Sequence, residues 1–98
     1  PIALHNLGIL YQNGQGVDQN LSTAFKYFKK SAKLGNSEAL YNLGLCYENG
    51  QGIEQDLIKA QEFYQMSISH GNEDARNQIN ELQKKADFFT KINLYLNK

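Results

Sequence analysis

Residues 43–52 read LGLCYENGQG, and residues 7–16 carry nearly the same segment, LGILYQNGQG. The likeness extends outward on both sides: residues 3–38 match residues 39–74 at 16 of 36 positions, so the chain repeats itself with a period of 36 residues. A period between roughly 20 and 50 residues is typical of a solenoid, in which each unit buries its apolar face on the next. The repeat therefore predicts the architecture before any single residue is considered.

Each copy begins with an amphipathic helix, which we expect at residues 2–12 and 38–48. Apolar and small residues of the first copy recur at the spacing of one helix face, namely Ala3, Leu4, Leu7, Gly8 and Tyr11. The segment Asn-Gly-Gln-Gly then follows in both copies, at 13–16 and 49–52. Two glycines one residue apart end a helix in a tight loop, because glycine adopts positive φ without steric cost.

A second helix is expected after each glycine loop. Asn20 and Asp56 stand one residue before the next apolar stretch, and both residue types are preferred helix N-caps. Glycine followed by asparagine closes each copy, at 35–36 and 71–72. The glycine suits the left-handed position after a helix, and the asparagine suits the cap of the following one. Each copy is therefore predicted to be a helix–loop–helix unit, and the fold to be an all-α solenoid.

A third copy begins at Ala75 but lacks the glycine loop. Apolar residues continue instead at helical spacing toward the end of the sequence, namely Ile79, Leu82, Ala86, Phe89, Ile92 and Leu96. We expect residues 75–98 to form a partial repeat with a capping helix, long or kinked near Asp87, since a solenoid needs an atypical terminal unit to cover its last apolar face. The expected domain plan is one solenoid over 1–98.

Composition excludes several classes of partner. The charges of ten acidic and ten basic residues cancel, and no basic cluster exceeds two adjacent lysines. The sequence therefore lacks the basic patch that nucleic-acid binding requires. No apolar run approaches the ~20 residues of a spanning helix, and we expect no membrane partner. The chain opens at Pro1 within a repeat, so we interpret it as a piece of a longer protein. The single cysteine weakly favours a reducing, cytoplasmic compartment.

Catalytic and cofactor chemistry find no support in the residues. No Ser/His/Asp or Cys/His set can be assembled, and no His, Cys, Asp or Glu cluster has metal-ligand spacing. The Gly-Gln-Gly segment at 14–16 follows a helix and lacks the third glycine and the lysine of a nucleotide-binding loop. Cys46 aligns with Leu10, which indicates a small core hydrophobe. We therefore expect no enzyme, no metal and no cofactor.

The pattern Ala-x₃-Leu-Gly-x₂-Tyr-x₂-Gly-x-Gly-(Val/Ile)-x₂-(Asn/Asp)-x₃-Ala, at 3–24 and again at 39–60, resembles the Sel-one-like repeat, a relative of the tetratricopeptide repeat. The resemblance implies a right-handed superhelix of antiparallel helix pairs, and an adaptor or scaffold that binds other proteins. It implies no single ligand. Cysteine-rich members are linked to β-lactam binding, and this chain, with one cysteine, lacks their defining feature.

The same resemblance implies where a partner would bind, because the first helices of such solenoids line the concave face. We expect the non-core positions of these helices to form the partner-binding surface: His5, Asn6, Ile9, Gln12, Tyr41, Asn42, Leu45 and Glu48, with Gln78 and additionally Asp74 from the third helix. Tyr41 is the expected anchor, since tyrosine is enriched at interface hot spots.

Two pairs within this surface have alternative interpretations. Tetratricopeptide domains that hold a peptide C-terminus use asparagine at the place of Asn6 and Asn42, but the accompanying cations are missing here, so we expect no carboxylate clamp. Each amide could instead satisfy a neighbouring helix. Ile9 and Leu45 form either an apolar strip in a groove or contacts covered by the adjacent repeat.

The favoured function is a non-catalytic interaction module that docks a partner peptide or helix on its concave face. The alternative is a structural spacer, or a segment that self-associates through its C-terminal helix. That helix carries more apolar side chains than one capping face requires, among them Phe88, Phe89, Leu94 and Tyr95.

Overall fold

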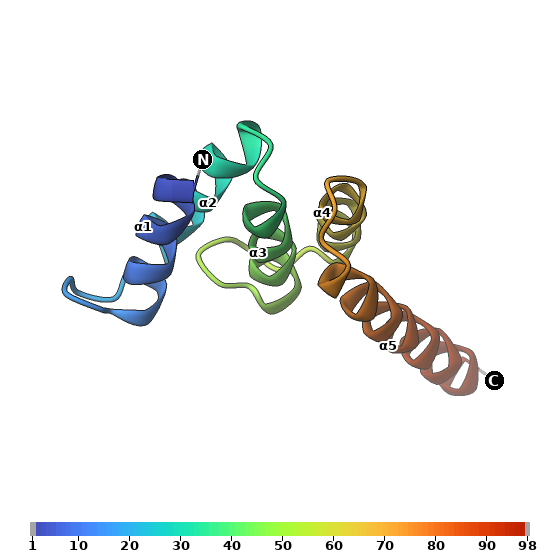
Figure 1. Ribbon diagram of the computed structural model, residues 1–98. Helices are drawn as coiled ribbons and strands as arrows, with labels where there is room; N and C mark the ends of the chain where they lie inside the picture. The colour runs from blue at the N-terminus through green and yellow to red at the C-terminus, as the bar shows by residue number, and fades with distance from the viewer. Residues whose placement is uncertain (1, 98) are drawn as a thin grey trace.

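The computed structural model describes residues 2–97, which form five α-helices and no strand. The helices are α1 (Ile2–Asn13), α2 (Leu21–Lys33), α3 (Ser37–Asn49), α4 (Leu57–Ser69) and α5 (Asp74–Leu96). Each helix packs against the next one in the sequence, so the helices form a row that measures 52 × 29 × 17 Å (Figure 1). The predicted all-α repeat solenoid is confirmed.

Asparagine and aspartate cap three of the helices as the sequence predicts. The side chains of Asn20 and Asp56 each accept a hydrogen bond from the backbone N–H three residues on, at 3.0 and 3.1 Å. Asn36 caps α3 in the same way, at 2.9 Å. Asn72 differs, because its side chain accepts from the backbone of Asp74, only two residues on, at 3.1 Å. These side chains satisfy N–H groups that have no partner within their helix.

The glycine loops set the lengths of the first helices in each unit. Gly14 and Gly50 both have φ of 68°, in the left-handed region that favours glycine, and they directly follow the last residues of α1 and α3. One further period of 36 residues leads to Ala86, and there the helix continues without a break to Leu96. The loss of this glycine accounts for the 23-residue length of α5.

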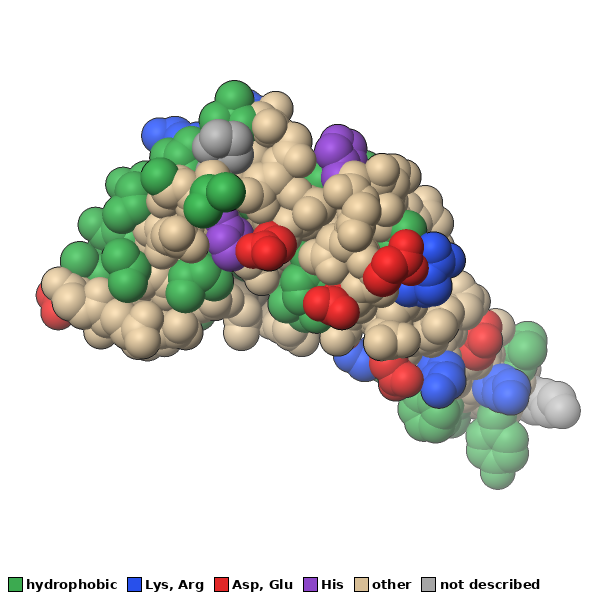
Figure 2. Space-filling model, viewed as in Figure 1, with side chains coloured by type: hydrophobic (Ala, Val, Ile, Leu, Met, Phe, Trp, Pro, Cys, Tyr) green, Lys and Arg blue, Asp and Glu red, His purple; other side chains and the backbone are tan. Residues whose placement is uncertain are grey.

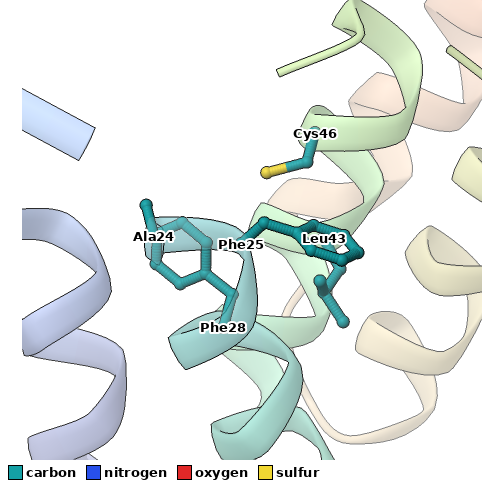
Figure 3. Packing of buried hydrophobic residues seen from close by; sticks show 5 residues of the cluster. All are labelled: Ala24, Phe25, Phe28, Leu43 and Cys46. Atoms are coloured by element: carbon teal, nitrogen blue, oxygen red, sulfur yellow. The ribbon is translucent and has the colours of Figure 1, made fainter. Parts of the chain in front are cut away.

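The first part of the core lies between α2 and α3. Its buried residues are Ala24, Phe25, Phe28, Leu43 and Cys46. Figure 3 shows Phe25 reaching from α2 to Leu43, with the Cys46 sulfur directed back toward α2. Cys46 is only 2% exposed, as expected for a core hydrophobe, and burial raises the pKa of its thiol to about 11.

The second part of the core joins α4 to α5 and contains Ala60, Tyr64, Ala75 and Leu82. Gly44 makes room for it on the side of α3, because a Cβ atom at this position would collide with the Tyr64 ring. Gly8 has the same relation to Phe28 in the first unit. The glycine inside each first helix is therefore required for close packing against the second helix.

Equivalent apolar residues of the two units differ in burial. Leu43 is 1% exposed, whereas Leu7, its counterpart in the first unit, is 38% exposed. The face of α3 that carries Leu43 is covered by α2, but within residues 2–97 no helix covers the corresponding face of α1. The repeat pattern alone does not distinguish these two positions.

Candidate partner-binding groove

A groove of about 370 Å³ opens between α1, the N-terminal half of α3 and the turn that joins α4 to α5. Figure 2 shows a histidine beside carboxylate groups on this face of the molecule. The lining residues come from three separate segments of the chain: His5, Ile9, Ser37, Glu38, Tyr41, Asn42, Gly71, Asn72 and Asp74. None of these lining residues is a lysine or an arginine, and two are carboxylates.

Local sequence signals place the two carboxylates at the ends of helices. The Asn36 cap starts α3, so Glu38 lies in its first turn. Gly71, with φ of 98°, reverses the chain after α4, and Asp74 lies in the first turn of α5. Acidic residues in a first turn also stabilise a helix through its dipole, which is a structural reason for their presence. The groove thus has two helix N-termini and two carboxylates at its rim.

His5 and Asn42 form a hydrogen-bonded pair between α1 and α3. The amide nitrogen Nδ2 of Asn42 donates to Nε2 of His5 at 2.7 Å. On the other side of the ring, Nδ1 of His5 lies 3.7 Å from Oε2 of Glu38. The Asn42 amide therefore forms a hydrogen bond to a neighbouring helix, as in the interpretation that each amide satisfies an adjacent helix. Its carbonyl oxygen is not used in this pair.

Tyr41 is half-buried at the groove and also packs against the second core. Its ring centroid lies 5.8 Å from that of Tyr64, in a tilted arrangement. The position that matches Tyr41 in the first unit is His5, whose ring lies 5.8 Å from the Phe28 ring in a nearly identical tilt. One side of each ring is therefore held by the core.

The groove brings together four of the predicted residues, namely His5, Ile9, Tyr41 and Asn42. The others lie outside its lining: Asn6, Gln12, Leu45, Glu48 and Gln78. Asn6 is exposed on α1, whereas Gln12 and Gln78 are half-buried. Leu45 packs against the core of α4 and α5, and Ile9 packs against the first core while it also borders the groove. Neighbouring helices thus partly cover both Ile9 and Leu45.

The expectation that Glu48 occupies a non-core position is wrong. Its side chain is 7% exposed and accepts hydrogen bonds from the Tyr64 hydroxyl at 2.8 Å and from Nζ of Lys85 at 2.6 Å. The carboxylate therefore joins α3, α4 and α5. His5 is likewise buried, at 8% exposure, because α3 covers it. A helix position that faces away from its own unit's core can still be covered by the next unit.

Sequence reasoning omitted Glu38 from the candidate surface, and it named Asp74 only as an additional residue of the third helix. A signal for both was present, because Glu38 and Asp74 are equivalent positions of the repeat and keep their negative charge. Ser37 and Asn72 were also missed. These residues lie at the boundaries between units, where the repeat pattern does not show which segments meet.

Other kinds of site are not supported by the described part of the chain. Among residues 2–97, no group of three or more His, Cys, Asp or Glu side chains could hold a metal ion. No helix in that range combines the length and apolarity needed to cross a bilayer. Every buried side-chain nitrogen or oxygen in the same range has a hydrogen-bond partner. The groove between α1, α3 and the α4–α5 turn is therefore the candidate site.

The fold and the groove together define the class of protein: an α-helical repeat protein with a groove on the surface of its solenoid. The Sel1 repeat model matches residues 1–36 and 37–72, two adjacent units with the period seen in the sequence. The chain belongs to the Sel1 repeat family. Repeats of this family mediate protein–protein interactions, and the fold is generally a non-catalytic interaction scaffold.

Solved structures of the same family are similar over most of this chain. A Sel1 repeat protein from Oxalobacter formigenes matches with a TM-score of 0.80 and 33% identity, over 83% of this chain and 61% of that one. The c5321 protective antigen of uropathogenic Escherichia coli matches with a TM-score of 0.84 and 29% identity, over 88% and 18% of the two chains. Cysteine rich protein B of Helicobacter pylori matches with a TM-score of 0.75 and 26% identity, over 78% and 57%.

This chain thus spans less than two thirds of the length of each of these relatives. No curated protein shows significant similarity to it.

Proposed function

We propose that the chain is an adaptor module that docks a peptide or helical segment of a partner protein in the groove beside Tyr41. The observation that carries this proposal is the meeting of α1, α3 and the α4–α5 turn around one open groove. The first helices that border it are those expected to line the concave face. A groove built from three segments offers a partner several contacts at fixed spacing, because most of the lining side chains are held by helices.

The lining favours a partner with hydrogen-bond donors and positive charge. Glu38 is 70% exposed at its side chain, and Asp74 is exposed as well, so both carboxylates can accept from a guest. Tyr41 adds a half-buried ring, and a cation placed over a tyrosine ring is attracted to its face. We therefore propose that the docked segment carries at least one lysine or arginine side chain.

Site-specific photocrosslinking in a lysate of the source organism tests this function. A photoreactive residue is placed at Glu38, in the groove, and in a matched variant at Glu62, an exposed position of α4 outside it. A protein crosslinked from position 38 and absent from position 62 supports the groove. Crosslinking that is equal at both positions, or stronger at 62, assigns the interface to another face. No crosslinked protein at either position favours the alternative of a structural spacer.

A further inference from the structure

The apolar face that attaches α5 to the core continues beyond the core. Ala75 and Leu82 are 0% and 4% exposed, because they pack against α4. Phe89 and Leu96 follow at the same seven-residue spacing, which returns a helix to nearly the same side, but they are 55% and 72% exposed. The same stripe is thus buried in the first half of α5 and open in the second.

The stripe changes from buried to open where α4 begins. Leu57, the first residue of α4, borders a small apolar groove together with Leu82 and Ala86 of α5. Past Ala86, α5 projects away from the other helices (Figure 1). Hydrophobic side chains are visible on this projecting part in Figure 2. Within the described residues, nothing packs on the segment from 87 to 96.

The projecting segment has an uncharged apolar face. Five residues recur at i, i+1, i+4, i+7 and i+8, which places them on one side of a helix; they are Phe88, Phe89, Ile92, Tyr95 and Leu96. Of the two charged residues of the segment, Asp87 falls on the opposite side together with Leu94, whereas Lys91 lies at the edge of the face, one helical turn from Phe88 and Tyr95. The centre of this face therefore favours an apolar occupant, since no charged side chain lies among these five residues.

We propose that this face binds the same face of a second copy of the chain, in an antiparallel pair of α5 helices. A two-fold axis beside Ile92 places this residue against its own counterpart. It also places Phe88 against Leu96 of the second copy, and Phe89 against Tyr95. A two-fold contact uses the same patch on both subunits, so the patch must be complementary to its own copy. An uncharged apolar strip does so without bringing like charges together.

The size of the face indicates how tight this pair is. Its three aromatic side chains are 55–76% exposed, which corresponds to roughly 350 Å² of aromatic surface per copy. Ile92 and Leu96 add to this, but the total stays below the ~800 Å² per partner of a standard interface. We therefore expect a reversible dimer with a dissociation constant in the micromolar range. The inference shares no residue with the proposed groove, so either can fail without the other.

Analytical ultracentrifugation of the 11.1 kDa chain from low micromolar to several hundred micromolar concentration tests the pair. The test variant is Ile92→Glu, at the centre of the face, and the matched control is Leu94→Glu, on the same helix turn but the opposite side. We expect the mean mass of the wild type and of Leu94→Glu to rise toward twice the monomer mass. For Ile92→Glu we expect at least a tenfold weaker association, with unchanged helicity by circular dichroism.

A second readout fixes the geometry of the pair. Ile92→Cys should form an intermolecular disulfide under mild oxidation, because the two-fold axis brings this position against itself, whereas Leu94→Cys should not. The native Cys46 is buried and does not compete. A wild type that stays monomeric throughout, or equal effects of the variants at 92 and 94, overturns the proposal. Binding of a monomeric chain to phosphatidylcholine vesicles through Ile92 also overturns it, since the occupant would then be a lipid surface.

Discussion

The Tyr64 hydroxyl donates a 2.8 Å hydrogen bond to Oε1 of Glu48, in a place where both side chains are buried. The other carboxylate oxygen of Glu48 accepts from Lys85 at 2.6 Å. The first unit has Gln12 and Phe28 at the positions of Glu48 and Tyr64, so this polar link belongs to the second unit alone. It connects the second unit to α5.

This link predicts strong coupling between the two positions. Tyr64→Phe removes the hydroxyl and should cost about 1–2 kcal/mol of unfolding free energy, and Glu48→Gln should cost a similar amount or more, because each change leaves a buried partner poorly satisfied. The double variant Glu48→Gln/Tyr64→Phe recreates the pair that the first unit already uses. Its cost should be smaller than the sum of the single costs, as measured by urea denaturation followed by circular dichroism. Additive costs would mean that the hydrogen bond contributes nothing specific.

Close packing at Gly44 predicts that even a methyl group is harmful there. Gly44→Ala should destabilise the chain by about 1–3 kcal/mol, because the new Cβ collides with the buried Tyr64 ring. This loss opposes the gain of up to ~1 kcal/mol that alanine normally brings to a helix interior. Asn6→Ala, at an exposed position of α1, is the control and should leave the melting temperature unchanged or slightly raised. A Gly44→Ala variant as stable as the wild type would contradict the packing described between α3 and α4.

Alkaline pH should destabilise the fold through Cys46 and Tyr64. Burial raises the pKa of the Cys46 thiol from 9.0 to about 11. Burial is the largest cause that raises the pKa of Tyr64 above its usual value, and the hydrogen bond to Glu48 is the next largest. In both cases the folded chain keeps a proton that the unfolded chain loses, so stability is full below pH 9 and falls as the pH rises above it.

Urea denaturation at a series of pH values from 8 to 11 measures this loss. The part that belongs to Cys46 amounts to about 2 kcal/mol by pH 11 and should disappear in Cys46→Ala. Tyr64→Phe should instead reduce the loss above roughly pH 10. Flat stability of the wild type across this range would show that neither group is protected from ionisation.

Charge at the groove predicts salt-sensitive binding of the partner. Glu38→Gln with Asp74→Asn keeps the shapes of both side chains and removes both charges. Affinity for a partner captured at the groove should fall about tenfold at low salt, with less difference at high salt, because screening already weakens exposed charges there. Isothermal titration at two salt concentrations measures this. The control is Glu54→Gln with Glu62→Gln, which removes two exposed carboxylates outside the groove and should change little. Equal losses in both double variants would point to overall charge rather than the groove.

The amino-acid sequence by itself determined the elements of this fold and their order. The caps at Asn20, Asn36 and Asp56 act within three residues, and the turns at Gly14 and Gly50 depend on backbone freedom at a single position. Such interactions are local, so they can be identified from residue type and spacing. The repeat then supplies the stacking, since each unit must cover the apolar face of its neighbour.

Only the tertiary structure decided which of these surfaces are buried and which are open. Leu7 and Leu43 occupy equivalent positions of the repeat, but α2 covers the second and not the first. Glu48, a charged residue on a polar-looking helix face, became part of the core because Tyr64 and Lys85 reach it from later helices. The groove likewise depends on α1, α3 and the α4–α5 turn meeting in space. Burial is a property of neighbours that are distant in the chain, and residue spacing within one helix does not specify them.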